Sequence, residues 1–141
     1  IIKKKTKNKK NEIYLSIMGM VDIIKPNEIE AEMLTGITIN DEDEAKKALE
    51  VLNKMGIKYP IISLGAKGIV YMKNNKVFHE QGIPVNAIDT TAAGDTFIGT
   101  LACEISKRKN LDDAVKIANK AAAICVQRMG AQKAIPYATE I

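Results

Sequence analysis

Apolar residues recur every three or four positions in several stretches of the chain, which is the period of an amphipathic helix with one buried face. Residues 41–56 show this period most clearly, because a capping residue, Asn40 or Asp41, opens the stretch and Met55-Gly56 ends it. The other expected helices are residues 13–20, residues 28–34 with a stop at Gly36, a long helix from about residue 93, and residues 111–128. The apolar faces that we expect to be buried are Ala45, Ala48, Leu49 and Leu52 in one helix, and Ile98, Leu101, Ala102 and Ile105 in another.

Short β-branched runs alternate with these helices and predict strands. The run from Tyr59 to Leu64 has the continuous apolar character of a strand that is buried on both faces. Further strands are expected at residues 21–24, 69–72, 77–79 and 85–88, and Asn74-Asn75 is a signal for a hairpin turn. This alternation of strands and helices is typical of an α/β layered fold.

Positive charge is concentrated at the start of the chain. Residues 1–10 hold six of the 21 lysine and arginine residues and no acid, so the other fifteen face 17 acids and the remainder carries a net charge of −2. A lysine block can bind nucleic acid or an anionic surface, but no aromatic residue stands among these lysines to stack on bases. We therefore expect no nucleic-acid function. Residues 1–20 are expected to be a lysine-rich irregular segment with a short helix, and residues 21–141 to be the folded part.

Composition also restricts the class of protein. The core must be aliphatic, because aromatic residues make up 4% of the chain and there is no Trp. No apolar run approaches the roughly 20 residues of a membrane-spanning helix, and no charged-then-apolar leader opens the sequence. Cys103 and Cys125 lie in apolar helical patterns without ligand spacing, so we expect free, buried thiols. Reduced thiols and no membrane segment indicate a cytoplasmic protein without a membrane partner.

The candidate chemistry lies in residues 89–97, Asp-Thr-Thr-Ala-Ala-Gly-Asp-Thr-Phe, which run from an expected strand end into the first turn of a long helix. The first N–H groups of a helix lack internal partners, and the helix dipole adds partial positive charge there. The small side chains of Ala92, Ala93 and Gly94 let an anion approach these groups, which predicts a phosphate cradle. Asp95 is either an ordinary residue of a helix start or a catalytic carboxylate, and Asp89 is equally compatible with a turn after a strand.

Three blocks, in this order, resemble the PfkB carbohydrate kinases, and among them the ribokinase branch. Residues 89–97 are similar to the family's second signature, residues 25–36 to its Asn-x-x-Glu block, and residues 63–68 to its nucleotide loop. The ending Arg128-x-Gly130-Ala131-Gln132, followed by Pro136, also resembles that branch. The resemblance covers about residues 21–141. It implies a ribokinase-like (Rossmann-like) three-layer α/β/α sandwich, of which the chain is the C-terminal portion with the lid missing.

The resemblance implies a catalytic centre at the start of the long helix. Asp95 would be the general base that takes the proton from a sugar hydroxyl as this hydroxyl attacks the γ-phosphate of ATP. The N–H groups of Ala92, Ala93 and Gly94 would form the anion hole. Phosphoryl transfer depends mostly on positioning and on charge stabilisation, which a helix terminus aimed at the transferred group provides.

The resemblance also implies positions for cofactors. Asn27 and Glu30 would hold Mg²⁺-bound phosphates largely through water, although the same pair also satisfies a helix N-cap with an acid in its first turn. The nucleotide would be bound by Asn27, Ser63, Leu64, Gly65, Ala66, Lys67, Gly68, Gly94, Asp95 and Asn119. A monovalent cation such as K⁺ would be bound by Asp89 and Thr91 and, through backbone carbonyls, by Cys125, Arg128 and Gly130. Ala134 stands where the family often has a serine, which removes one expected oxygen.

The activity that follows from the resemblance is an ATP-dependent sugar kinase, with D-ribose converted to ribose 5-phosphate as the best match. The alternatives are another acceptor, such as fructose or adenosine, and a non-catalytic nucleotide-binding module. Sugar-binding residues and the lid of such kinases lie mainly in their N-terminal half, so we expect little or no activity from this chain alone. An exposed sheet edge would favour self-association, for example as a homodimer.

Overall fold

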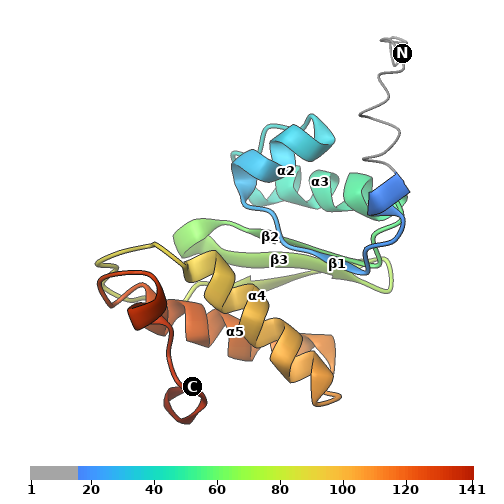
Figure 1. The fold of residues 1–141 in the computed structure, drawn as a ribbon. Coiled ribbons are helices and arrows are strands. Elements are labelled where there is room, and N and C mark those ends of the chain that lie inside the picture. Colours follow the sequence, from blue (N-terminus) through green and yellow to red (C-terminus); the bar gives the residue numbers. More distant parts are fainter. Residues whose placement is uncertain (1–15) are drawn as a thin grey trace. The chain divides into compact units, whose positions relative to one another are not determined.

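The computed structural model describes residues 16–141, which form helices and one sheet (Figure 1). The chain divides into two compact units. The first runs up to Ser63 and includes Val70–Phe78, and the second comprises Leu64–Ile69 and His79–Ile141. The lysine block lies outside the described residues, as does the first part of the helix expected at 13–20, whose residues 16–18 are helical. No helix in the described part of the chain is long and apolar enough to cross a membrane.

The sheet contains, in spatial order, β1 (Ile23–Ile24), β2 (Tyr59–Ser63), β3 (Gly68–Lys73) and β4 (Lys76–Gln81). Strands β1 and β2 are parallel, and the middle of β2 is fully buried, as its continuous apolar run predicts. Asn74 and Asn75 connect β3 to β4 with φ angles of 51° and 59°. Two successive left-handed residues are what a type I′ hairpin requires. The predicted hairpin and the α/β class are confirmed.

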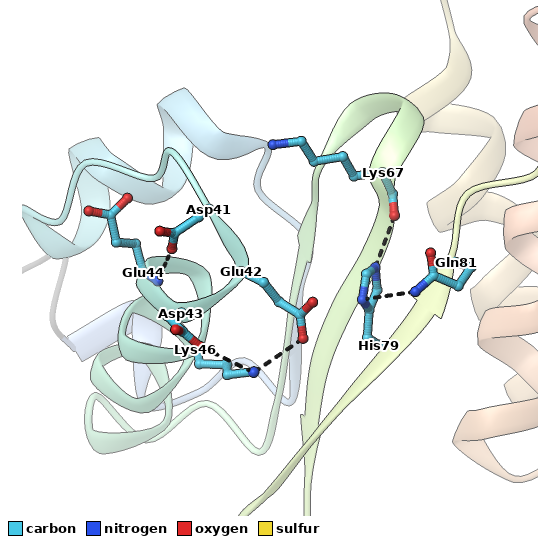
Figure 2. A network of polar contacts seen from close by, with 8 residues as sticks. All are labelled: Asp41, Glu42, Asp43, Glu44, Lys46, Lys67, His79 and Gln81. Carbon is cyan, nitrogen blue, oxygen red and sulfur yellow. Dashed lines mark hydrogen bonds and ion pairs between the residues drawn. The ribbon is translucent and has the colours of Figure 1, made fainter.

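Helices α2 (Glu28–Thr35) and α3 (Glu42–Lys54) belong to the first unit, where α3 packs against β2. Gly36 takes the left-handed conformation (φ 74°) and ends α2 at the predicted place. Asp41 is the cap of α3, because its carboxylate accepts the Glu44 N–H at 2.9 Å (Figure 2). The predicted apolar face of α3 is confirmed, since all four of its residues are completely buried: Ala45, Ala48, Leu49 and Leu52.

Helices α4 (Ala93–Ser106) and α5 (Leu111–Cys125) pack against each other in the second unit. The predicted buried face of α4 is wrong except for Leu101. The buried residues of the helix are Thr96, Phe97, Leu101 and Glu104. Glu104 is acidic and buried, and the Lys107 ammonium group, 2.6 Å from its carboxylate, compensates the cost of this burial. The pattern of apolar positions does not predict that a carboxylate will be buried next to a cation.

The connections before and after these two helices differ from the sequence prediction. Residues 85–88 form no strand, and Ile88 is 62% exposed. The N–H of Ile88 donates to the Val126 carbonyl at 2.7 Å, so the segment pairs with a turn instead of a strand. Helix α5 ends at Cys125, three residues earlier than predicted, because the chain turns there to make this contact. Two short 3₁₀ turns follow, η2 (Gln132–Ala134) and η3 (Ala138–Glu140).

The two cysteines are both free, as predicted. Cys125 is buried, but Cys103 is exposed on α4, so the prediction of a buried thiol is wrong for Cys103. The cause is the same as for the other misplaced residues of α4. Helical periodicity alone does not decide which side of an alanine-rich and apolar helix faces the interior.

Thr96 in the first turn of α4 is 3% exposed, and its hydroxyl has no hydrogen-bond partner within residues 16–141. A buried polar group without a partner destabilises the folded state. We therefore expect Thr96→Val, which keeps the shape and removes the hydroxyl, to raise the free energy of unfolding by about 1 kcal/mol. Urea unfolding measures the change, with the exposed Thr139→Val as a control that gains nothing. A lower unfolding midpoint for Thr96→Val would contradict the expectation.

Candidate functional site

The N-terminus of α4 leaves backbone N–H groups uncovered. Ala92, the N-cap residue, has the left-handed conformation (φ 63°), and no side chain in the described part of the chain caps the helix. The Ala93 N–H donates to the Thr90 carbonyl at 3.2 Å, so one of the predicted anion-hole groups already has an acceptor. The N–H groups of Gly94 and Asp95 have none in the described part of the chain. Uncovered N–H groups at the positive end of a 14-residue helix are suited to a phosphate.

The Asp95 side chain is exposed at the third position of α4. It does not act as a helix cap, and among residues 16–141 it has no hydrogen-bond or ion-pair partner. Its carboxylate is therefore open to solvent beside the uncovered N–H groups. An unpartnered carboxylate in that place can accept a proton from a hydroxyl that is bound next to the phosphate.

Asp89 lies at the centre of a second cluster, in the turn before α4. Its Oδ1 accepts the Thr91 N–H at 2.9 Å, and its Oδ2 accepts the Gly130 N–H at 2.9 Å. The Cys125 thiol donates to the Thr91 carbonyl, with 3.8 Å between sulfur and oxygen. The Arg128 N–H donates to the Cys125 carbonyl at 3.1 Å. The structure thus brings together the five residues predicted as cation ligands, and we call them the Asp89 cradle.

Hydrogen bonds from Thr91, and then from the Gly130 N–H, hold the pKa of the Asp89 carboxyl below its ordinary value of 3.8. A depressed pKa in the folded state means that the carboxylate adds stability above about pH 4, and that this contribution is lost as the pH falls through the lowered pKa. We expect Asp89→Asn to unfold at a lower temperature at pH 7, with a deficit that shrinks on acidification. Thermal unfolding at a series of pH values measures it. A deficit that does not depend on pH would exclude the charged carboxylate as its cause.

The glycine loop, residues 64–68, is a 3₁₀ turn held by its own backbone. The Leu64 N–H donates to the Gly68 carbonyl at 2.8 Å, and the Lys67 N–H donates to the Leu64 carbonyl at 3.0 Å. The Lys67 carbonyl also accepts a hydrogen bond from Nε2 of His79 on β4, at 2.9 Å (Figure 2). His79 therefore supports the shape of this loop.

Gly82 lies next to the glycine loop but is not part of any of the three sequence motifs. A Cβ atom on Gly82 would lie 2.0 Å from the Ala66 carbonyl oxygen, and one on Gly68 would lie 2.2 Å from the Glu80 oxygen. Only glycine allows such a close approach of two backbones. Gly82 directly follows β4, and a glycine after a strand is equally compatible with an ordinary turn.

Asn119, one of the predicted nucleotide-binding residues, is buried on α5. Its side-chain Nδ2 donates to the Gln81 carbonyl at 2.8 Å, directly before Gly82. The side chain therefore ties α5 to the backbone that borders the glycine loop. This contact gives Asn119 a role in the architecture of the second unit, whether or not a nucleotide is bound.

Asn27 and Glu30 form a complete capping box at the start of α2. The Asn27 side-chain oxygen accepts the Glu30 N–H at 2.8 Å, and Glu30 Oε2 accepts the Asn27 N–H at 2.9 Å. The alternative interpretation of this pair as a helix cap is thus present in the structure. Asn27 also forms a parallel bridge with Ser63, which places both residues at the same end of β1 and β2 in the first unit.

The predicted site residues therefore fall into two sets. Asn27, Glu30 and Ser63 belong to the first unit, and the glycine loop, the start of α4, Asn119 and the Asp89 cradle belong to the second. Within residues 16–141, no three histidine, cysteine, aspartate or glutamate side chains gather in a way that could hold a metal ion. A metal ion here would need water, backbone oxygens or a bound phosphate among its ligands.

Comparison with known proteins agrees with these motifs. A family model described as pfkB family carbohydrate kinase matches residues 3–138. Ribokinase from Staphylococcus aureus is 43% identical over 126 residues, which are 89% of this chain and 41% of that protein. The chain thus spans about two fifths of the length of this curated relative.

Two solved structures show a similar fold. Arabidopsis thaliana ribokinase, in complex with ribose and ATP, has a TM-score of 0.81 and 31% identity, over 86% of this chain and 40% of that one. A fructokinase from Vibrio cholerae O395, in a form with fructose, ADP and potassium ion bound, has a TM-score of 0.78 and 30% identity, over 89% and 41%. The predicted ribokinase-like fold is confirmed by these matches.

Proposed function

The chain belongs to the pfkB family of carbohydrate kinases, and we propose that it forms the nucleotide side of an ATP-dependent kinase that phosphorylates a sugar hydroxyl, with D-ribose as the acceptor. The observation that carries this proposal is the exposed Asp95 carboxylate beside the uncovered N–H groups at the start of α4. The ribokinase from Staphylococcus aureus and the Arabidopsis structure with ribose and ATP support the choice of acceptor and phosphate donor.

In the proposed reaction, the sugar hydroxyl oxygen attacks the γ-phosphorus of ATP, the bond to the bridging oxygen breaks, and ADP leaves. Asp95 accepts the hydroxyl proton as the new O–P bond forms. The Gly94 and Asp95 N–H groups and the positive end of the α4 dipole stabilise negative charge on the transferred phosphoryl oxygens. The residues need no rearrangement of the helix start for this, because these N–H groups are already uncovered.

Mg²⁺, when bound, neutralises charge on the ATP phosphates. Asn27 and Glu30 are suited to it, because Glu30 is exposed and the capping box uses only one of its carboxylate oxygens, Oε2. Mg²⁺ prefers oxygen ligands and keeps several waters, so a single carboxylate with a neighbouring amide is a sufficient protein contribution. The capping box would then fix the orientation of the carboxylate that faces the hydrated ion.

The Asp89 cradle is suited to a monovalent cation. Both Asp89 oxygens accept one N–H group each, and an oxygen with a second lone pair can also contact a cation. The potassium ion in the Vibrio fructokinase supports K⁺ as the ion. Ala134 is completely buried and contributes no side-chain oxygen, so we expect weaker cation binding than a serine would allow.

A chimera tests whether this chain can supply the nucleotide side of the reaction, and a separate experiment identifies the acceptor. A chimera in which residues 16–141 replace the matching segment of Staphylococcus aureus ribokinase should phosphorylate ribose, whereas the 141-residue chain alone should show little activity. A chimera that binds ATP but transfers no phosphate would favour the non-catalytic nucleotide-binding module.

The acceptor is identified with the full-length protein that carries this chain. Ribose, fructose and adenosine are each supplied with ATP, and formation of ADP is measured. A higher kcat/KM for fructose or adenosine than for ribose would replace ribose in the proposal. Cytoplasmic location and homodimer formation stay predictions from the sequence.

A further inference from the structure

Arg128 and Glu140 form a two-point ion pair in the segment that follows α5. Arg128 Nη2 lies 2.6 Å from Glu140 Oε1, and Nη1 lies 3.4 Å from Oε2. Glu140 Oε2 also accepts the Tyr137 N–H at 2.7 Å, which fixes the carboxylate within the turn η3. Each partner of the pair is held at two points, which defines the geometry more tightly than a single contact would.

Arg128 belongs both to this ion pair and to the Asp89 cradle. The Arg128 N–H donates to the Cys125 carbonyl at 3.1 Å, and two residues later the Gly130 N–H donates to Asp89 at 2.9 Å. The Val126 carbonyl accepts the Asp89 N–H at 3.1 Å. The turn of residues 126–130 is thus fastened to Asp89 on one side and, through the Arg128 side chain, to η3 on the other.

Both side chains of the pair are 36% exposed, and surface ion pairs of this kind add little to global stability. The pair does not therefore explain why the unit folds. Its effect is local, because it closes the segment between residues 128 and 140 and restrains the turn of residues 126–130. Gly130 in this turn has a φ of 99°, a conformation that glycine adopts more readily than other residues.

We propose that Arg128 and Glu140 are positioning residues that hold the 126–130 turn against Asp89, and so keep the carbonyl oxygens of the Asp89 cradle in place. Neither side chain needs to contact a cation for this role. That the restrained carbonyls bind K⁺ rests on the proposed function, whereas the restraint itself does not.

Amide hydrogen exchange in the 141-residue chain tests the restraint. We expect Glu140→Gln and Arg128→Gln to accelerate exchange of the Gly130 N–H about fivefold, with little change in the urea unfolding midpoint. Arg128→Lys keeps the positive charge but loses the contact through two guanidinium nitrogens, so exchange of the Gly130 N–H should be intermediate in this variant. Lys133→Gln, which removes an exposed charge in the same segment, is the matched control and should leave the exchange rate unchanged. Exchange of Gly130 that is equal in Glu140→Gln and the unaltered chain overturns the proposal.

Thermal unfolding in KCl and in tetramethylammonium chloride separates this proposal from the cation assignment. A midpoint that K⁺ raises in the unaltered chain, and raises less in Glu140→Gln, supports both. If K⁺ has no effect on the unaltered chain but Gly130 exchange is still faster in the variant, the cation assignment fails and the positioning role stands. If K⁺ raises both midpoints equally and exchange is unchanged, the positioning role fails and the cation assignment stands.

Discussion

Asp95→Asn should lower kcat for ribose phosphorylation in the chimera by a factor of about 10²–10⁴, the usual contribution of a positioned general base. Asparagine keeps the size of the side chain but cannot accept the hydroxyl proton. The side chain is exposed and has no partner within residues 16–141, so its replacement breaks no contact on which the fold depends. ATP binding should be retained, because the neighbouring N–H groups belong to the backbone. Steady-state kinetics together with calorimetric titration of ATP measure the two effects separately.

The control is Asp22→Asn, which makes the same chemical change at an exposed carboxylate in the first unit. It should leave both kcat and ATP affinity unchanged. Near-normal turnover in Asp95→Asn would refute the assignment of the base. An equal loss of turnover in both variants would indicate a general effect of charge instead of a role in proton transfer.

Gly82→Ala should destabilise the 141-residue chain by about 1–3 kcal/mol and weaken ATP binding in the chimera. The added methyl group would lie 2.0 Å from the Ala66 carbonyl oxygen, and that neighbour is backbone that cannot rotate away. Either the glycine loop or the end of β4 must shift. Urea unfolding and ATP titration measure the two consequences. An unaltered unfolding midpoint with unaltered ATP affinity would mean that the close approach is not maintained in solution.

Gly68→Ala and Gly99→Ala are comparison variants for Gly82→Ala, the first with a larger expected loss of stability and the second with an expected gain. Gly68 combines a similar clash, 2.2 Å to the Glu80 oxygen, with a φ of 101° that alanine rarely adopts, so its replacement should cost more than that of Gly82. Gly99 lies inside α4, and apart from the adjoining backbone of the helix no atom of residues 16–141 lies within 4 Å of the added Cβ. Gly99→Ala should therefore stabilise the chain by up to about 1 kcal/mol, through helix propensity alone. This order distinguishes steric conflict from a general effect of losing glycine.

The candidate site was predictable to the extent that its parts are contiguous in the sequence. The run of small residues from Ala92 to Gly94 predicted uncovered N–H groups at a helix start, and the structure has such groups at Gly94 and Asp95. It did not predict that the Ala93 N–H bonds the Thr90 carbonyl, because that contact depends on the left-handed conformation of Ala92. Nor could it choose between the capping box and a phosphate contact for Asn27 and Glu30, because one spacing serves both.

The sequence by itself determined the features that depend on near neighbours. These are the buried face of α3, the stop at Gly36, the Asn74-Asn75 hairpin and the helix start at Ala93, since turn geometry and helical period depend on residues close in the sequence. Only the tertiary structure decided that Asp89 accepts a hydrogen bond from Gly130, 41 positions away, that Gly82 packs closely against the Ala66 backbone, and that Glu104 is buried. Such contacts arise where whole elements pack together, and no local pattern of side chains specifies which distant backbone will lie opposite.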